Sequence, residues 1–218
     1  MTEPATYLYI KVQKRMKIYK KNNLDEIIND LKNNEIVAFP TETVFGLGII
    51  ASSEANYLKM VDTKKRPPEK PFTLMCSSIE MAARYVEVSD IAKKVLNKFT
   101  PGPITLILPK KENVPSFIDL NSGYVGIRIP KNNEVLEVIS KINMPLMVPS
   151  ANISGQEPIK EQQGIIETFN GKISGVLEGE CASNTPSTIV KIDKDTIILI
   201  RRGEISLEEI MESAKWKL

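Results

Sequence analysis

The sequence has no histidine among its 218 residues. This absence excludes catalytic triads and dyads that depend on a histidine base, and every metal site that needs imidazole ligands. Only two cysteines occur, Cys76 and Cys181, and they form no CxxC pair, which excludes a zinc ribbon and a redox dithiol. Any chemistry must therefore use lysine, arginine, carboxylate, hydroxyl and backbone amide groups.

Long apolar runs are also missing. No stretch approaches the roughly 18 residues of a membrane-spanning helix, and the first residues lack the apolar core of a signal peptide. The net charge of +2, from 29 basic and 27 acidic residues, gives no strong reason to expect a nucleic-acid or membrane partner. We expect a cytoplasmic protein in which residues 1–218 form a single domain, with no membrane contact.

The hydrophobic pattern indicates an α/β fold, because short strand-like segments alternate with amphipathic helical segments from about residue 16 onward. Capping-box spacings predict two helix starts, at Asn23 with Glu26 and at Ser206 with Glu209. Other helices are expected at residues 54–62, 79–86, 90–98, 133–142 and 160–169. Strands are expected at residues 35–39, 72–75, 104–108, 124–129, 146–148, 187–192 and 196–200.

Polar loops follow several of these strands, and the first is PTETVFGLG at residues 40–48. A loop at the carboxyl end of a strand is a favoured ligand position in α/β proteins. Thr41 and Thr43 offer hydroxyl groups there, and Gly46 and Gly48 would let the backbone approach a ligand closely. We therefore expect a ligand-binding loop over this segment.

A basic turn at residues 64–71 is the second candidate. Two prolines stiffen it, so that Lys64 and Arg66 would project cations from a fixed backbone. Rigid cations of this kind suit phosphate oxygens. A solvated basic loop is the alternative interpretation of the same residues.

Two further loops and two arginines complete the candidates. PGPIT leads into a strand at Thr105, and PSANISG places Ser150 and Asn152 on one side of an extended segment. Without a histidine to activate them, these hydroxyl groups are expected to bind a ligand rather than attack it. Arg128 and Arg201 lie at the ends of apolar strands, where a cation needs a protein carboxylate or an anionic ligand as its partner.

One stretch is strongly basic, with six cations among residues 11–21. It fits an edge strand whose lysines discourage pairing with another chain, and it also fits contact with RNA. The sequence favours the edge strand.

Taken together, these motifs resemble the YrdC-like family over about residues 17–211, which leaves residues 1–16 as an N-terminal extension. The matching segments occur in the family's order: PTETVFGLG, the Lys64-x-Arg66-Pro67 turn, PGPIT, VGIRIP, PSANISG, PSTIV and LIRRG. The resemblance implies a twisted, mixed β-sheet with flanking helices around a concave basic cavity.

The resemblance also implies an activity, that of a cytoplasmic nucleotidyltransferase. Such an enzyme forms threonylcarbamoyl-AMP and pyrophosphate from L-threonine, bicarbonate and ATP, for modification of an adenosine beside the anticodon of certain tRNAs. Further partners that it implies are tRNA or double-stranded RNA and a downstream threonylcarbamoyl transferase complex. Mg²⁺ is expected to be held chiefly by the triphosphate, with no protein metal site.

Roles for single residues follow from the same resemblance. The residues that match the catalytic basic pair at the nucleotide phosphates are Lys64 and Arg66. Those that match other nucleotide contacts are Thr105, Asn152 and Arg201. Those that match contacts near the substrates are Thr41, Arg128, Ser150 and Ser187.

Three positions depart from the family pattern. Phe45 stands where tyrosine is usual, Met75 where many active members have histidine, and Pro186 where glutamate is common. The run around Met75 looks like the YciO branch, which leaves an alternative: a paralogue that binds RNA, a nucleotide or an amino acid without turnover. The intact PTET and PSAN segments favour the active branch.

Overall fold

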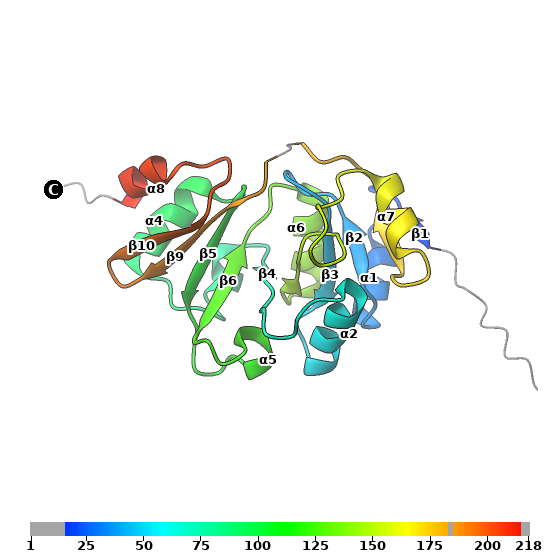
Figure 1. Cartoon of the computed structure of the whole chain (residues 1–218), viewed down its shortest axis with the longest axis horizontal. Helices are drawn as coiled ribbons and strands as arrows, with labels where there is room; N and C mark the ends of the chain where they lie inside the picture. Colours follow the sequence, from blue (N-terminus) through cyan, green and yellow to red (C-terminus); the bar gives the residue numbers. More distant parts are fainter. Residues whose placement is uncertain (1–15, 183–184, 215–218) are drawn as a thin grey trace, which may run out of the picture.

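The computed structural model describes residues 16–182 and 185–214. Its strands form one mixed sheet in the order β1-β8-β2-β3-β7-β4-β6-β5-β9-β10 (Figure 1). Along the chain they are β1 (Lys17–Tyr19), β2 (Val37–Phe39), β3 (Gly46–Ile50), β4 (Leu74–Met75), β5 (Ile104–Pro109), β6 (Tyr124–Arg128), β7 (Leu146–Met147), β8 (Gly175–Leu177), β9 (Thr188–Asp193) and β10 (Thr196–Arg201). The pairs β1–β8, β8–β2, β4–β6 and β5–β9 are parallel, and the other neighbouring pairs are antiparallel. The expected mixed α/β sheet is confirmed.

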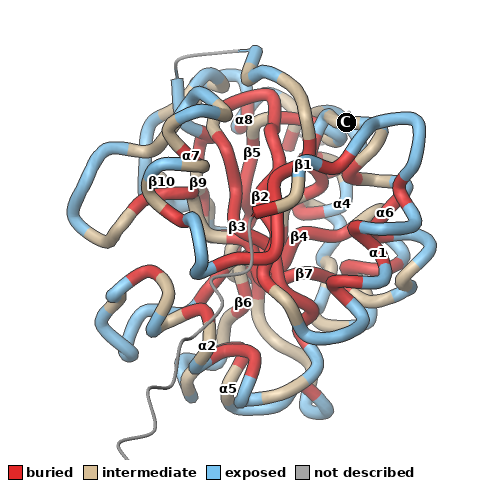
Figure 2. Tube along the Cα trace, turned by 90° about the vertical axis from the view of Figure 1, so that its right-hand side faces the viewer, coloured by how far each residue is buried: buried red, intermediate tan, exposed pale blue. Residues whose placement is uncertain are grey.

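The helices cover this sheet through apolar faces. They are α1 (Asp25–Lys32), α2 (Glu54–Lys64), α3 (Ile79–Ala82), α4 (Asp90–Phe99), α5 (Ser116–Asp119), α6 (Asn133–Ile142), α7 (Gln162–Phe169) and α8 (Leu207–Ala214). Figure 2 shows α1, α4 and α6 on one side of the strands, with the buried chain at the centre. In α1, for example, Ile27, Ile28 and Leu31 recur at helical spacing and are buried. None of the described helices is both long and apolar enough to cross a membrane.

The capping predictions have different outcomes. At the start of α8, Glu209 N–H donates to Ser206 Oγ (3.2 Å) and Ser206 N–H donates to the Glu209 carboxylate (2.8 Å), so this capping box is confirmed. The one predicted at Asn23 is wrong, because Leu24 occupies the N-cap of α1 and makes no side-chain cap bond. The Asn23 side chain instead accepts the N–H of Asp25 (3.3 Å).

The expectation of a loop throughout residues 40–48 is wrong at its C-terminal end, where β3 begins at Gly46. A Cβ atom at Gly48 would lie 2.6 Å from the Phe39 ring on the neighbouring strand. Gly48 therefore permits close packing of β3 against Phe39, which is a different use of glycine from the expected approach to a ligand. Strand β8 and helix α5 were also not expected from the pattern.

Strand β1 lies at one edge of the sheet. It belongs to the part of the basic run that the structure describes, and this edge position is the expected one. Residues 11–15 of that run lie outside the described residues. Lys17 forms an ion pair with Asp30 (2.8 Å), and Lys20 forms one with Glu178 (2.8 Å). These two lysines therefore have protein carboxylates as partners.

Candidate functional site

A cavity lies where the polar loops meet the ends of β4, β5, β6 and β9. The predicted site residues that line it are Thr41, Arg66, Thr105, Arg128, Ser150, Ser187 and Arg201. The positions that depart from the family pattern, Phe45, Met75 and Pro186, line it as well. The remaining two predicted residues, Lys64 and Asn152, lie directly behind the Ser150 wall.

Strand alternation explains why residues far apart in the sequence meet here. On β5, Thr105 lies between two core residues and faces the cavity, because successive side chains point to opposite faces. The register pairs Thr105 with Ile189 of β9, and Met75 of β4 with Arg128 of β6. All four side chains line the cavity.

The Thr41 hydroxyl group is held within its own turn. Its Oγ1 donates to the carbonyl of Val44 (2.7 Å) and lies 3.0 Å from Oγ1 of Thr43. Thr41 has thereby used its only hydroxyl proton, so Thr43 must be the donor between the two threonines. The same Oγ1 atom also accepts the N–H groups of Thr43 (3.2 Å) and Val44 (3.3 Å). Toward a ligand, Thr41 can therefore act only as an acceptor, and only by giving up one of these longer bonds.

Arg128 is anchored by the same loop. Its Nη2 donates to Oε1 of Glu42 (2.9 Å) and to Oγ1 of Thr43 (2.8 Å). The second Glu42 oxygen accepts the backbone N–H of Lys131 (3.2 Å). The Nε atom of Arg128 is buried and has no hydrogen-bond partner among the described residues. The arginine therefore has a protein carboxylate on one nitrogen and a free donor on another.

Arg201 holds Ser187 in place on the opposite wall. Its Nε and Nη2 donate to the Ser187 carbonyl (3.1 and 2.8 Å), and Nη2 also donates to Ser187 Oγ (2.9 Å). Because Ser187 Oγ accepts from the arginine, its own proton can go to Thr105 Oγ1, 3.5 Å away, or to an anion in the cavity. Burial lowers the pKa of Arg201, and the nearby charge of Arg128 lowers it further. The two guanidinium groups therefore add to a positive potential.

Lys64 is the last residue of α2 and is only 1% exposed. Its Nζ donates to the carbonyls of Ser150 and Asn152 and to Oδ1 of Asn152. Ser150 Oγ donates to the same Oδ1 atom (2.6 Å). Burial lowers the pKa of Lys64 to about 8, with a further contribution from the charge of Arg66. Lys64 thus supports the PSAN segment from behind and does not itself line the cavity.

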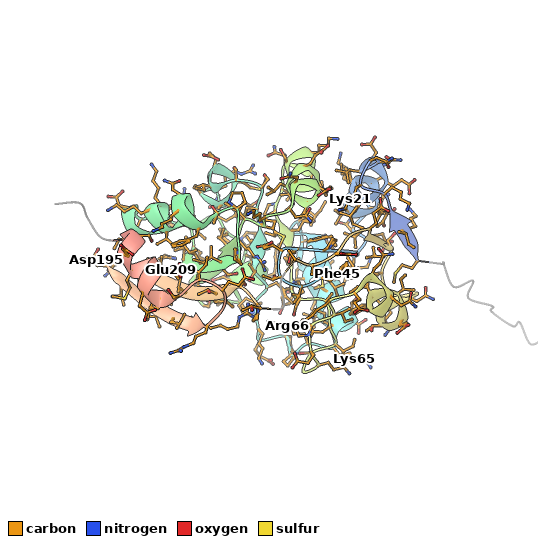
Figure 3. The ribbon with its side chains drawn as sticks, turned by 90° about the horizontal axis from the view of Figure 1, so that it is seen from above. Lys21, Phe45, Lys65, Arg66, Asp195 and Glu209 are labelled. Carbon is orange, nitrogen blue, oxygen red and sulfur yellow. The ribbon has the colours of Figure 1, made fainter. Side chains whose placement is uncertain are left out.

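Arg66 is held by its own turn. Its Nε and Nη2 donate to the carbonyls of Lys70 and Pro71 (3.2 and 3.3 Å), and its guanidinium lies 5.1 Å from the centre of the Phe72 ring. Burial lowers its pKa. Figure 3 shows Arg66 in the central part of the molecule and the exposed Lys65 toward its margin. Of the two neighbouring cations, Arg66 is the one that lines the cavity.

Neither Glu42 nor Phe72 is among the site residues predicted from the sequence. The signal for Glu42 was present, since its carboxylate lies in a loop directly after a buried strand. Among the described residues, no group of three or more histidine, cysteine, aspartate or glutamate side chains could hold a metal ion. The cavity therefore offers cations and hydroxyl groups, which suit an anionic ligand.

The sequence is similar to those of proteins named threonylcarbamoyl-AMP synthase. The threonylcarbamoyl-AMP synthase of Pyrococcus abyssi is 35% identical over 182 residues, which cover 83% of this chain and 54% of that protein. The Bacillus subtilis enzyme of the same name is 32% identical, over 83% of this chain and 53% of its own. The chain thus spans about half the length of these two relatives. A relative from Methanocaldococcus jannaschii is 34% identical over 90% of this chain and 96% of its own.

Solved structures agree with the fold. P. abyssi Sua5 in complex with L-threonine superposes with a TM-score of 0.84 at 31% identity, over 91% of this chain and 59% of that one. E. coli YciO gives a TM-score of 0.82 over 89% of this chain and 99% of its own, but at 18% identity it shows the fold alone. The family model for Sua5, YciO and YrdC proteins, described as "Telomere recombination", matches residues 29–203. This chain therefore belongs to the Sua5/YciO/YrdC family.

Proposed function

We propose that this protein forms threonylcarbamoyl-AMP and pyrophosphate from L-threonine, bicarbonate and ATP. One observation carries the proposal: a single cavity is lined by Arg66, Arg128 and Arg201 together with hydroxyl groups. ATP, a carbamate and a carboxylate bring several negative charges into one site, and these cations would offset them. Relatives named threonylcarbamoyl-AMP synthase, and a Sua5 structure that holds L-threonine, support the same assignment.

In this proposal the threonine nitrogen attacks bicarbonate to give a carbamate with loss of water. A carbamate oxygen then attacks the α-phosphorus of ATP. The bond from that phosphorus to the bridging oxygen breaks, and pyrophosphate leaves. The carbamate is already an anion, so the step needs no histidine base, and alignment and charge compensation supply the acceleration.

The residue roles are part of the proposal. Around the nucleotide we place Arg66 at the phosphates, together with Thr105 and Arg201, and Lys64 and Asn152 behind the cavity wall. Around the amino acid we place Thr41, Arg128, Ser150 and Ser187. ATP would enter as its Mg²⁺ complex, with the metal bound to the triphosphate as part of the substrate. In the arrangement seen, Lys64 would contribute its charge through the Ser150–Asn152 segment behind the cavity wall.

The cellular setting is also proposed. The product would pass to a transferase complex that modifies a tRNA adenosine in the cytoplasm. A paralogue that binds RNA or a nucleotide without turnover is not favoured, because the relatives named as synthases match at 32–35% identity, whereas the likeness to YciO shows the fold alone.

Pyrophosphate release tests the activity. The purified chain is incubated with ATP, bicarbonate and L-threonine, and both pyrophosphate and the adenylate are quantified. The two products are expected in equal amounts. Omission of L-threonine is expected to abolish both signals. Pyrophosphate release that is independent of L-threonine, or its absence in the complete mixture, would overturn the proposal.

A further inference from the structure

The pair formed by Glu42 and Arg128 is the most enclosed ion pair at the cavity. The two side chains are 9% and 11% exposed, and Nη2 of Arg128 lies 2.9 Å from Oε1 of Glu42. A carboxylate withdrawn from water to this extent needs its cation, and removal of either partner leaves an uncompensated charge. The conformations of the two side chains are therefore coupled.

Glu42 also connects three parts of the chain. Its backbone belongs to the loop after β2, its Oε1 accepts from Arg128 on β6, and its Oε2 accepts the N–H of Lys131 in the segment before α6. Both carboxylate oxygens are thus engaged. The side chain can hold Arg128 in one position because its own position is fixed from two directions.

The hydrogen bonds determine which donors Arg128 can offer. Both Nη2 protons are used, one by Glu42 and one by Thr43. The Nε–H is buried and has no partner among the described residues. A buried donor of this kind is costly unless a ligand or water accepts from it. The donors that Arg128 retains for an acceptor arriving with a ligand are therefore those of Nη1 and Nε.

Charge distinguishes Arg128 from Arg66 and Arg201. Glu42 compensates the charge of Arg128, whereas the hydrogen bonds that hold Arg66 and Arg201 go to carbonyl and hydroxyl oxygens. A compensated arginine attracts a triphosphate less than an uncompensated one, but its directed N–H groups still suit a single carboxylate. Without Glu42, repulsion from Arg201 would also displace Arg128.

We propose that Glu42 is a positioning residue that fixes Arg128 for the carboxylate of the amino-acid substrate and thereby separates the carboxylate subsite from the phosphate subsite. This inference rests on the proposed function. It assigns Glu42 an effect on L-threonine binding that acts through Arg128, and no direct contact with the substrate.

The test compares equilibrium binding of L-threonine and of ATP by calorimetry, without turnover. Glu42→Gln is expected to weaken L-threonine binding about tenfold or more, the range for loss of a hydrogen bond to a charged group, and to leave ATP binding no weaker. Glu35→Gln is the matched control, because Glu35 pairs with Lys59 on the surface with both side chains 40% exposed. It is expected to leave both affinities unchanged.

A double-mutant cycle separates positioning from a structural role. In an Arg128→Lys background, Glu42→Gln is expected to have little further effect on L-threonine binding, because the residue it acts through is already altered. Equal losses in both backgrounds, or unchanged or tighter L-threonine binding in Glu42→Gln, would overturn the inference. If the wild-type chain itself does not bind L-threonine, the proposed function fails instead.

A measurement on the wild-type protein covers the case in which Glu42→Gln does not fold. In protein labelled with ¹⁵N-arginine, the Nε–H resonance of Arg128, assigned with Arg128→Lys, is expected to shift when L-threonine is added and to shift little with threonine amide, which lacks the carboxylate. A resonance that responds to ATP and ignores L-threonine would contradict the inference.

Discussion

Lys64 lies beneath Asn152 and donates from one ammonium group to both its main-chain carbonyl (2.7 Å) and its side-chain Oδ1 (3.2 Å). The contact joins the C-terminal end of α2 to the PSAN segment, 88 positions later in the sequence. A basic residue and a polar loop that the sequence presents as separate motifs are thus one structural unit. The protonation state of Lys64 therefore affects the loop that lines the cavity.

The first prediction concerns that proton. Burial lowers the pKa of Lys64 to about 8, and a bound triphosphate would raise it again by favouring the charged form. We expect ATP binding to take up a proton at about pH 8.5, and less at about pH 7.5 where Lys64 is already mostly charged. Calorimetry in buffers of different ionisation enthalpy measures this uptake.

Lys64→Met is expected to abolish the uptake at the higher pH, whereas Lys59→Met at the surface is expected to retain it. Proton uptake that is zero at both pH values in the wild-type chain would contradict the prediction.

The second prediction uses two neighbouring cations in different environments. Arg66 lines the cavity, whereas Lys65 is exposed. Arg66→Ala is expected to weaken ATP binding by about 1–3 kcal/mol, the range for charge-assisted hydrogen bonds, and Lys65→Ala by much less. Equilibrium binding with labelled ATP measures both. Equal losses of ATP affinity in the two variants would mean that the basic turn at residues 64–71 acts on ATP only through its total charge.

Part of this site could be predicted from the sequence because its residues occupy the ends of strands and the loops after them. Thr105 and Arg128 could be placed near the ends of strands from the hydrophobic pattern, whereas the role of Ser187 follows from the resemblance alone. The bond from Arg128 to Glu42 spans 86 positions, and no local pattern indicates that these two residues meet. For Lys64 the difference lies in a helix end: the pattern predicts residues 54–62, whereas α2 continues to Lys64 and thereby places its side chain inside.

The third prediction concerns stability in acid. Burial alone would raise the pKa of Asp30, but hydrogen bonds from Lys17, Ser174 and Tyr19 outweigh it, and the pKa lies below the ordinary value of 3.8. A carboxyl group with a lowered pKa in the folded state stabilises the fold fully above its unfolded pKa, and this contribution is lost as the pH falls through the folded value.

Asp30→Asn is therefore expected to cost about 1–3 kcal/mol of unfolding free energy at neutral pH and progressively less below about pH 4. Urea unfolding across this pH range measures the difference. A cost that is constant down to about pH 2 would show that the charge of Asp30 is not what stabilises the edge strand.

The last prediction concerns discrimination between L-threonine and L-valine, which differ by a hydroxyl in place of a methyl group. The Thr41 hydroxyl proton is committed to the Val44 carbonyl, and its oxygen accepts the N–H groups of Thr43 and Val44. A substrate hydroxyl would donate to this oxygen in place of one of these long backbone bonds. Valine has no proton to give, so it cannot make this bond, and it would place a methyl group against polar atoms, which such sites do not tolerate well. We expect kcat/KM for valine to be lower by more than about tenfold.

Thr41→Ser retains the acceptor and is expected to preserve most of this discrimination, whereas Thr41→Val removes the acceptor and is expected to reduce it. Similar use of both amino acids by the wild-type chain, measured as pyrophosphate release, would show that the Thr41 region does not recognise the substrate hydroxyl.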